Sequence, residues 1–166
     1  MEKQPTKSCC ERGPDDKELS LDEAGYDATE RAVLHVARFF WQSFATPNSH
    51  AWISAMTHAE RYFGGSVAFK VLCTVQAMRV SRVSCFRFNN PSCKGCAAIV
   101  SEHERHFMNT FMAVRAGRRG PAETHAMMLC EGNDTRPFIE QMTALVDATC
   151  ARPKVARFSS VASTQD

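Results

Sequence analysis

Apolar residues recur with helical spacing through the first half of this chain. The spacing predicts an amphipathic helix over residues 27–46, because its apolar positions fall on one stripe. A second helix is predicted up to residue 63, with Asn48 and Ser49 as candidate N-caps, and a third over residues 66–84. The stripe of the first helix consists of Val33, Ala37, Phe40, Trp41 and Phe44.

The second half of the chain repeats this helical pattern. A fourth helix is predicted over residues 97–116, a fifth from Pro121, and a sixth that Pro153 stops. No segment of useful length alternates between apolar and polar residues as a strand would, and there is no internal repeat. The predicted fold is therefore an all-α, single bundle-like domain of five or six helices, with a Cys-rich loop between the third and fourth.

Composition divides the chain into three parts. Residues 1–18 are polar and acidic and predict a disordered arm, residues 19–153 form the helical domain, and residues 154–166 form a flexible tail. The first residues lack the apolar stretch of a secretory signal, and no run approaches the roughly 20 apolar residues that span a bilayer. We therefore expect a cytoplasmic protein without a membrane partner, whose eight cysteines are mostly reduced.

The segment from Cys85 to Cys96 contains the densest group of potential metal-binding side chains. Cys93 and Cys96 form a CxxC with Gly95 before the second thiol, a spacing that turns both sulfurs the same way. Cys85 can fold back across the intervening residues as a third thiolate. His103 and His106 follow within ten residues and supply imidazoles. The pattern predicts a zinc site with the ligands Cys85, Cys93, Cys96, His103 and His106.

The ligand set stays open at this point. The fourth ligand can be His103, His106, Cys130 or Cys73, although His103 also lies on the apolar stripe of its helix and suits a buried histidine. An iron–sulfur cluster on Cys85, Cys93, Cys96 and Cys130 ranks below zinc, because the spacing matches no ferredoxin pattern. Thiol–disulfide exchange is the other reading of the CxxC, but the thioredoxin type needs a preceding strand.

Charge is unevenly distributed. Residues 61–120 hold ten basic and two acidic side chains, whereas residues 1–30 hold nine acidic and four basic ones. The basic middle, interleaved with Phe86 and Phe88, predicts a surface for nucleic acid or another anion; a solvated helix surface balanced by the acidic arm is the alternative. The candidate binding residues are Arg79, Arg82, Arg87, Lys94, Arg118 and Arg119.

Motifs for nucleotide binding, serine hydrolysis and metalloprotease chemistry are missing from the sequence. Only the cysteine and histidine cluster, with Glu102 or Glu104 as an orienting group, offers a nucleophile beside a base. The working hypothesis is a small regulatory or binding protein, and not an enzyme, whose Cys-rich loop binds zinc or senses oxidants. A protein partner or self-association fits such a role. The alternatives are a nucleic-acid-binding regulator and a thiol-dependent enzyme.

Overall fold

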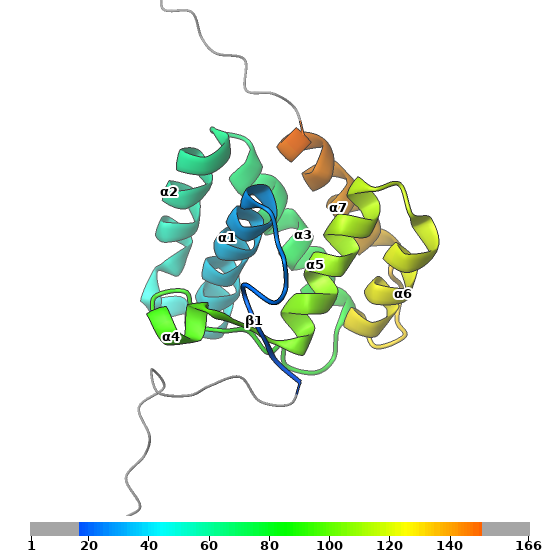
Figure 1. The fold of residues 1–166 in the computed structure, drawn as a ribbon, viewed down its shortest axis with the longest axis horizontal. Helices are drawn as coiled ribbons and strands as arrows, with labels where there is room; N and C mark the ends of the chain where they lie inside the picture. The colour runs from blue at the N-terminus through cyan, green and yellow to red at the C-terminus, as the bar shows by residue number, and fades with distance from the viewer. Residues whose placement is uncertain (1–16, 151–166) are drawn as a thin grey trace, which may run out of the picture.

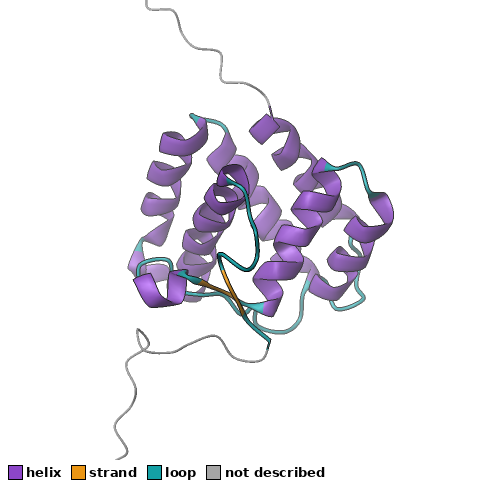
Figure 2. Ribbon diagram, viewed as in Figure 1, coloured by secondary structure: helices purple, strands orange, loops and turns teal. Residues whose placement is uncertain are grey.

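The computed structural model describes residues 17–150 as a helical domain with one short strand pair (Figures 1 and 2). All of the predicted arm except residues 17 and 18, and all of the predicted tail, lie outside the described residues. The elements in chain order are β1 (Leu19–Ser20), α1 (Ala28–Ala45), the 3₁₀ helix η2 (Pro47–Ser49), α2 (Ala51–Phe63), α3 (Val67–Ser81), α4 (Lys94–Ala97), β2 (Ile99–Val100), α5 (Glu102–Arg115), α6 (Arg119–Leu129) and α7 (Arg136–Cys150). The prediction of an all-α fold is confirmed, with α4 as a small addition to six longer helices.

Two helical hairpins flank a central pair of helices. The α1–α2 hairpin and the α5–α6 hairpin lie on opposite sides of the molecule, and α3 and α7 pack against each other between them (Figure 1). The apolar stripes of the six long helices meet in one core, whose largest fully buried side chains include Phe107, Phe111 and Phe138. None of the helices within residues 17–150 is both long and apolar enough to cross a membrane.

The ends of the first two helices illustrate which local signals decide helix boundaries. At the start of α1, Asp27 and Glu30 form a reciprocal capping box, in which each side chain accepts a hydrogen bond from the other residue's backbone N–H. The prediction that Asn48 or Ser49 caps α2 is wrong. Those residues form η2, and His50 is the N-cap of α2 in a left-handed conformation, with a φ of 51° and no capping hydrogen bond from its side chain within residues 17–150.

The predicted fourth helix is divided in the structure. Residues 94–97 form α4, Ile99–Val100 pairs antiparallel with Leu19–Ser20, and α5 begins only at Glu102. The start predicted at Ala97 is therefore wrong. Ser101 and Glu104 form a capping box that satisfies the first N–H groups of α5, so this helix needs no residues before 102. The interruption separates Cys93 and Cys96 from the helix that carries the two predicted histidine ligands.

Candidate functional site

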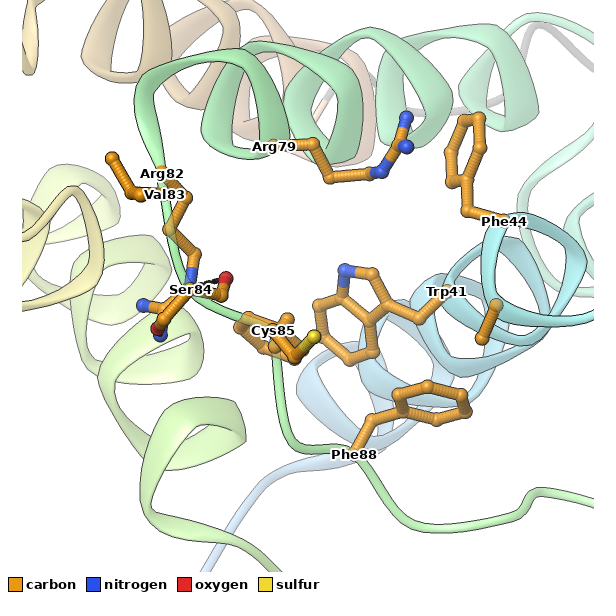
Figure 3. A pocket seen from close by; sticks show the side chains of 10 residues that line it. Trp41, Phe44, Arg79, Arg82, Val83, Ser84, Cys85 and Phe88 are labelled. Atoms are coloured by element: carbon orange, nitrogen blue, oxygen red, sulfur yellow. Dashed lines mark hydrogen bonds between the residues drawn. The ribbon is translucent and has the colours of Figure 1, made fainter.

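A cavity of about 340 Å³ lies between the C-terminal half of α1, the end of α3 and the segment that follows α3 (Figure 3). Its volume is within the range of about 300–1,000 Å³ that small-molecule sites occupy. We call it the Trp41–Arg79 pocket. Its lining consists of Trp41, Phe44, Ala45, Arg79, Arg82, Val83, Ser84, Cys85, Phe86 and Phe88.

Trp41 supplies a buried donor without an acceptor. Its side chain is 2% exposed, and the indole Nε1–H has no hydrogen-bond partner in the described part of the chain. Figure 3 shows this nitrogen on the edge of the ring that faces the space below Arg79. A buried donor left without an acceptor costs about 1–3 kcal/mol. Phe86, Phe88 and Phe107 hold the indole, with ring centres 4.4, 6.3 and 5.1 Å from it.

Arg79 supplies a positive charge on the opposite side of the pocket. Its guanidinium carbon lies 3.8 Å from the centre of the Phe44 ring, and one of its nitrogens donates to Gln76 Oε1 at 2.7 Å. Arg79 forms no ion pair with a carboxylate among residues 17–150. The cation–π contact fixes the guanidinium plane while leaving its charge unbalanced.

Arg82 is part of the pocket wall but its hydrogen bonds are already formed. Its side chain is 4% exposed, donates to the carbonyls of Ser84 and Leu129, and forms an ion pair with Glu131 at 3.1 Å. Glu131 also accepts hydrogen bonds from the Ser84 hydroxyl and from the backbone N–H groups of Val83 and Ser84. These bonds, led by the Ser84 hydroxyl, lower the pKa of Glu131 to about 2. The Arg82–Glu131 pair therefore forms part of the pocket wall, and Arg82 does not offer a second unpaired cation to a ligand.

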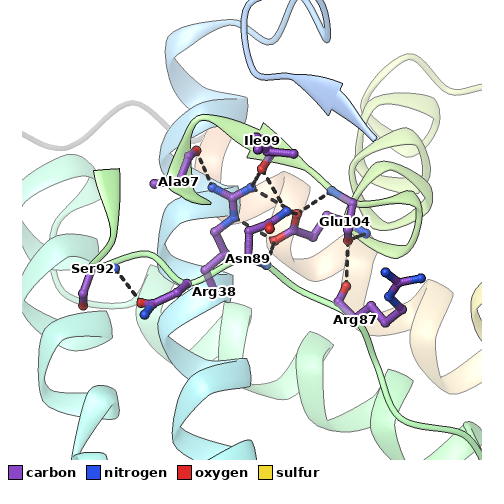
Figure 4. Close-up of polar contacts among 9 residues, drawn as sticks. Arg38, Arg87, Asn89, Ser92, Ala97, Ile99 and Glu104 are labelled. Atoms are coloured by element: carbon purple, nitrogen blue, oxygen red, sulfur yellow. Dashed lines mark hydrogen bonds and ion pairs between the residues drawn. The ribbon is translucent and has the colours of Figure 1, made fainter. Parts of the chain in front are cut away.

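A buried polar network holds the far end of the loop that bears the pocket's aromatic wall (Figure 4). Arg38 donates to both carboxylate oxygens of Glu104, at 2.7 and 3.0 Å, and to the carbonyls of Ala97 and Ile99. Asn89 donates to the same carboxylate through its backbone and its side chain. Because Asn89 immediately follows Phe88, the network fixes the position of the pocket wall relative to α1 and α5.

The predicted zinc ligands lie in four separate environments, and one of these is that of His106, which faces His125. Cys85 is exposed and lines the pocket, whereas Cys93 and Cys96 sit at α4, where the Cys96 N–H donates to Cys93 Sγ at 3.4 Å. His103 Nδ1 accepts a hydrogen bond from Arg87 N at 2.8 Å, which uses this nitrogen to hold the loop. Burial, followed by the charge of Arg82, lowers the pKa of His103.

Within residues 17–150, no three or more His, Cys, Asp and Glu side chains are grouped so that they could hold a metal ion. Zinc and iron–sulfur binding by the Cys-rich loop, and its redox sensing, therefore remain predictions from the sequence. The structure also bears on the fourth ligand, for which the sequence left several candidates. Cys130 is fully buried beside the core, and burial raises the pKa of its thiol, which disfavours the thiolate that metal binding requires.

The six residues predicted to bind an anion lie in separate parts of the structure. Arg79 and Arg82 line the pocket, while Arg87 and Lys94 are exposed outside it. Arg118 and Arg119 line a different cavity, of about 490 Å³, between the start of α6 and the start of α7. The structure thus brings together two of the six predicted residues and adds aromatic groups from α1.

Comparison of the chain with protein-family models, with curated proteins and with solved structures finds no match. A helical fold by itself assigns no activity, because one fold carries many functions. The functional assignment therefore rests on the chemistry of the Trp41–Arg79 pocket.

Sequence reasoning placed Trp41 and Phe44 only in the core stripe of the first helix, and so it missed their role in the pocket. The usable signal was the concentration of aromatic residues in the last two turns of that helix, together with the alternation of arginine and phenylalanine after α3. The capping box of Ser101 and Glu104 could also have been predicted from the sequence, because Ser-x-x-Glu before an apolar run is typical of one.

The packing of histidines between α1 and α2 leads us to expect that folding stability depends on pH. His35 packs against Phe39, His58 and Tyr62, with ring centres 5.1, 4.5 and 6.3 Å away. Burial, followed by the charges of His58 and Arg38, lowers the pKa of His35 to about 4. In the unfolded chain His35 takes up a proton near its ordinary pKa of about 6.5, so we expect folding stability to fall as the pH drops from about 6.5 to about 4.

Replacing His35 with phenylalanine is expected to flatten this pH dependence, because the new ring fills the site without titrating. The reduction in slope should be below about 1.4 kcal/mol per pH unit, since the ring is partly exposed. Urea unfolding at pH 7, 6, 5 and 4 measures it, and the exposed His50→Asn variant is the control. An unchanged slope in His35→Phe would show that this ring does not contribute.

Proposed function

We propose that this protein is a small-ligand-binding protein whose Trp41–Arg79 pocket binds an aromatic anion, namely a planar ring that bears a carboxylate or a phosphate. The observation that carries the proposal is the buried indole N–H of Trp41, which faces the cavity opposite the Arg79 guanidinium; among residues 17–150 the N–H lacks an acceptor and the guanidinium lacks a carboxylate partner. Both groups are donors, so the complementary ligand group is an acceptor with negative charge.

The pocket wall favours a ring as the body of the ligand. Phe44, Phe86 and Phe88 line the cavity together with Trp41, and aromatic pairs contribute about 0.5–1.5 kcal/mol beyond the area they bury. The ligand oxygens would meet Trp41 Nε1 and Arg79, and its ring would contact the phenylalanines. A hydrogen bond to a charged group contributes about 1.5–3 kcal/mol, so the anionic group should dominate selectivity.

Two features favour a small ligand over a nucleic acid strand. The cavity is lined by three segments and holds about 340 Å³, which suits a small molecule. The basic residues predicted for strand binding also do not form one track, because Arg82 is buried in its own ion pair and Arg118 lies by a different cavity. Nucleic acid binding remains a prediction from the sequence, and so does the proposed regulatory role.

The two indole N–H signals of the chain provide a direct test by NMR. Trp41 is buried in the pocket, whereas Trp52 is 50% exposed on α2 and serves as an internal control. Benzoate and phenyl phosphate are the probes, and benzamide is the uncharged match. We expect benzoate, phenyl phosphate or both to move the Trp41 signal and leave the Trp52 signal in place. Benzamide should bind about 10–100-fold more weakly, since it lacks the charge.

Matched variants separate the contribution of the Arg79 charge from that of the pocket's shape. Arg79→Gln should reduce benzoate affinity to that of benzamide, whereas Arg87→Gln, an exposed arginine outside the pocket, should leave it unchanged. The binding of the charged probe should also protect Cys85, which is exposed at the pocket, from alkylation. If neither anionic probe moves the Trp41 signal at millimolar concentration in folded protein, the proposal is wrong.

A further inference from the structure

Two histidines meet between α5 and α6, on a part of the molecule that does not contribute to the Trp41–Arg79 pocket. His106 projects from the second turn of α5 and His125 from the middle of α6, and both are half-buried. Their Nδ1 atoms lie 3.0 Å apart, and the ring centres are 5.2 Å apart. Sequence reasoning named His106 as a candidate ligand, but it gave no sign that His125 would be its neighbour.

The separation of the two nitrogens matches the bite of a transition-metal ion. With metal–nitrogen bonds of about 2.0–2.1 Å, two ligand nitrogens lie about 2.9 Å apart at a right angle and about 3.4 Å apart at the tetrahedral angle. The observed 3.0 Å falls between these values. Without a metal, the same distance requires one ring to donate a proton to the other, and each ring then has a single tautomer.

We propose that His106 and His125 form a two-histidine chelate for a divalent transition-metal ion, bound through both Nδ1 atoms, with water completing the coordination. Imidazole nitrogens favour zinc, copper, nickel and iron over magnesium and calcium. The site has fewer than the three protein ligands of a catalytic zinc centre, so it is a modest-affinity site that bridges two helices.

Charged residues near the two histidines determine how favourably a cation binds there. Glu102, one turn before His106 on α5, acts on His106 with its negative charge and favours a bound cation, whereas Arg105 acts on both rings and opposes it. Burial, which is the leading cause, lowers the pKa of His106 and of His125. The neutral imidazole is the form that binds a metal, so binding at this pair should weaken as the pH falls.

A bound ion would tie α6 to the rest of the domain. α6 packs mainly against α5 and only weakly against α7, so the two histidines are well placed to reinforce its principal contact. Because a ligand that binds the folded state alone stabilises it, zinc should slow the hydrogen exchange of α6 amides.

Titration with Zn²⁺, followed through the ring nitrogens by NMR, tests the site while separating it from thiol binding. The separation matters because the chain has eight cysteines that also take up zinc. We expect the Nδ1 signals of His106 and His125 to move together, and those of His35 and His58 to stay in place. His125→Gln should weaken the effect on His106 at least about tenfold, as His106→Gln should for His125.

The control is His50→Asn, which changes an exposed histidine in η2's C-cap and should leave the titration unchanged. The Trp41 indole signal verifies that each variant is folded, and the wild-type titration stands alone if a variant fails this check. If Zn²⁺ moves only signals next to cysteines, or moves His106 equally in the His125→Gln protein, the chelate is overturned.

Discussion

Replacing Arg38 with methionine is expected to lower the free energy of unfolding by about 3–5 kcal/mol. The substitution leaves the Glu104 carboxylate, which is completely buried, without its ion-pair partner. It also removes the Arg38 donor from the carbonyl of Ala97 and leaves the carbonyl of Ile99 with only the Asn89 amide as a side-chain donor. Urea unfolding at pH 7 measures the loss. Arg31→Met removes an exposed ion pair with Asp22 and one hydrogen bond to the carbonyl of Tyr26, and it should cost about 1 kcal/mol.

A double variant distinguishes the lost ion pair from lost packing. Arg38→Met combined with Glu104→Gln removes the uncompensated charge and keeps one acceptor oxygen, which can serve either the Asn89 N–H or the Ser101 N–H, since these donate to different oxygens of Glu104. It should recover part of the stability that Arg38→Met loses. If Arg38→Met alone costs under about 1 kcal/mol, the pair is not the structural centre that its burial implies.

Replacing Phe107 with alanine is expected to cost about 3–5 kcal/mol, because the cavity left in the core cannot fully collapse. Phe107 is 0% exposed and packs against Trp41 and Phe138, with ring centres 5.1 and 5.9 Å away. Thermal or urea unfolding measures the effect. The same variant should also displace the indole of Trp41 and weaken binding of benzoate in the pocket.

The comparison variant is Phe69→Ala, a phenylalanine on α3 that is 62% exposed. It removes the same atoms from the surface and should change stability by about 0.5 kcal/mol or less. Phe107→Leu should fall between the two, because leucine refills most of the space. Equal losses at Phe107 and Phe69 would contradict the assignment of Phe107 to the core.

Local patterns predicted the helices well where a cap and an apolar stripe coincide. The helix over 28–45 has both, since its stripe faces the core and Asp27 caps its first turn. The prediction of one helix over 97–116 was wrong, because the apolar period continues through Ile99 and Val100. Those two residues instead pair with Leu19 and Ser20, about 80 positions earlier, and sequence spacing does not show such a contact.

The candidate site was harder to predict, because its parts come from distant segments. Arg79, Arg82 and Cys85 were named from one basic, cysteine-containing stretch, under two separate hypotheses, whereas the pocket combines them with Trp41 and Phe44. Only the packing of α1 beside the end of α3 brings these groups together. An unsatisfied indole N–H is likewise a property of the folded state, and no residue pattern reveals it.

The contacts that join residues far apart in the chain also bear on how fast this domain acquires its structure. The α1–α2 and α5–α6 hairpins unite neighbouring segments, whereas the Arg38–Glu104 pair spans 66 positions. Loop-closure entropy favours contacts between close neighbours, so the hairpins are expected to assemble early and the ion pair late. A contact absent from the transition state controls the unfolding rate. Loss of the Arg38–Glu104 pair is therefore expected to raise the unfolding rate and shorten the lifetime of the native state. The folding rate should stay nearly unchanged.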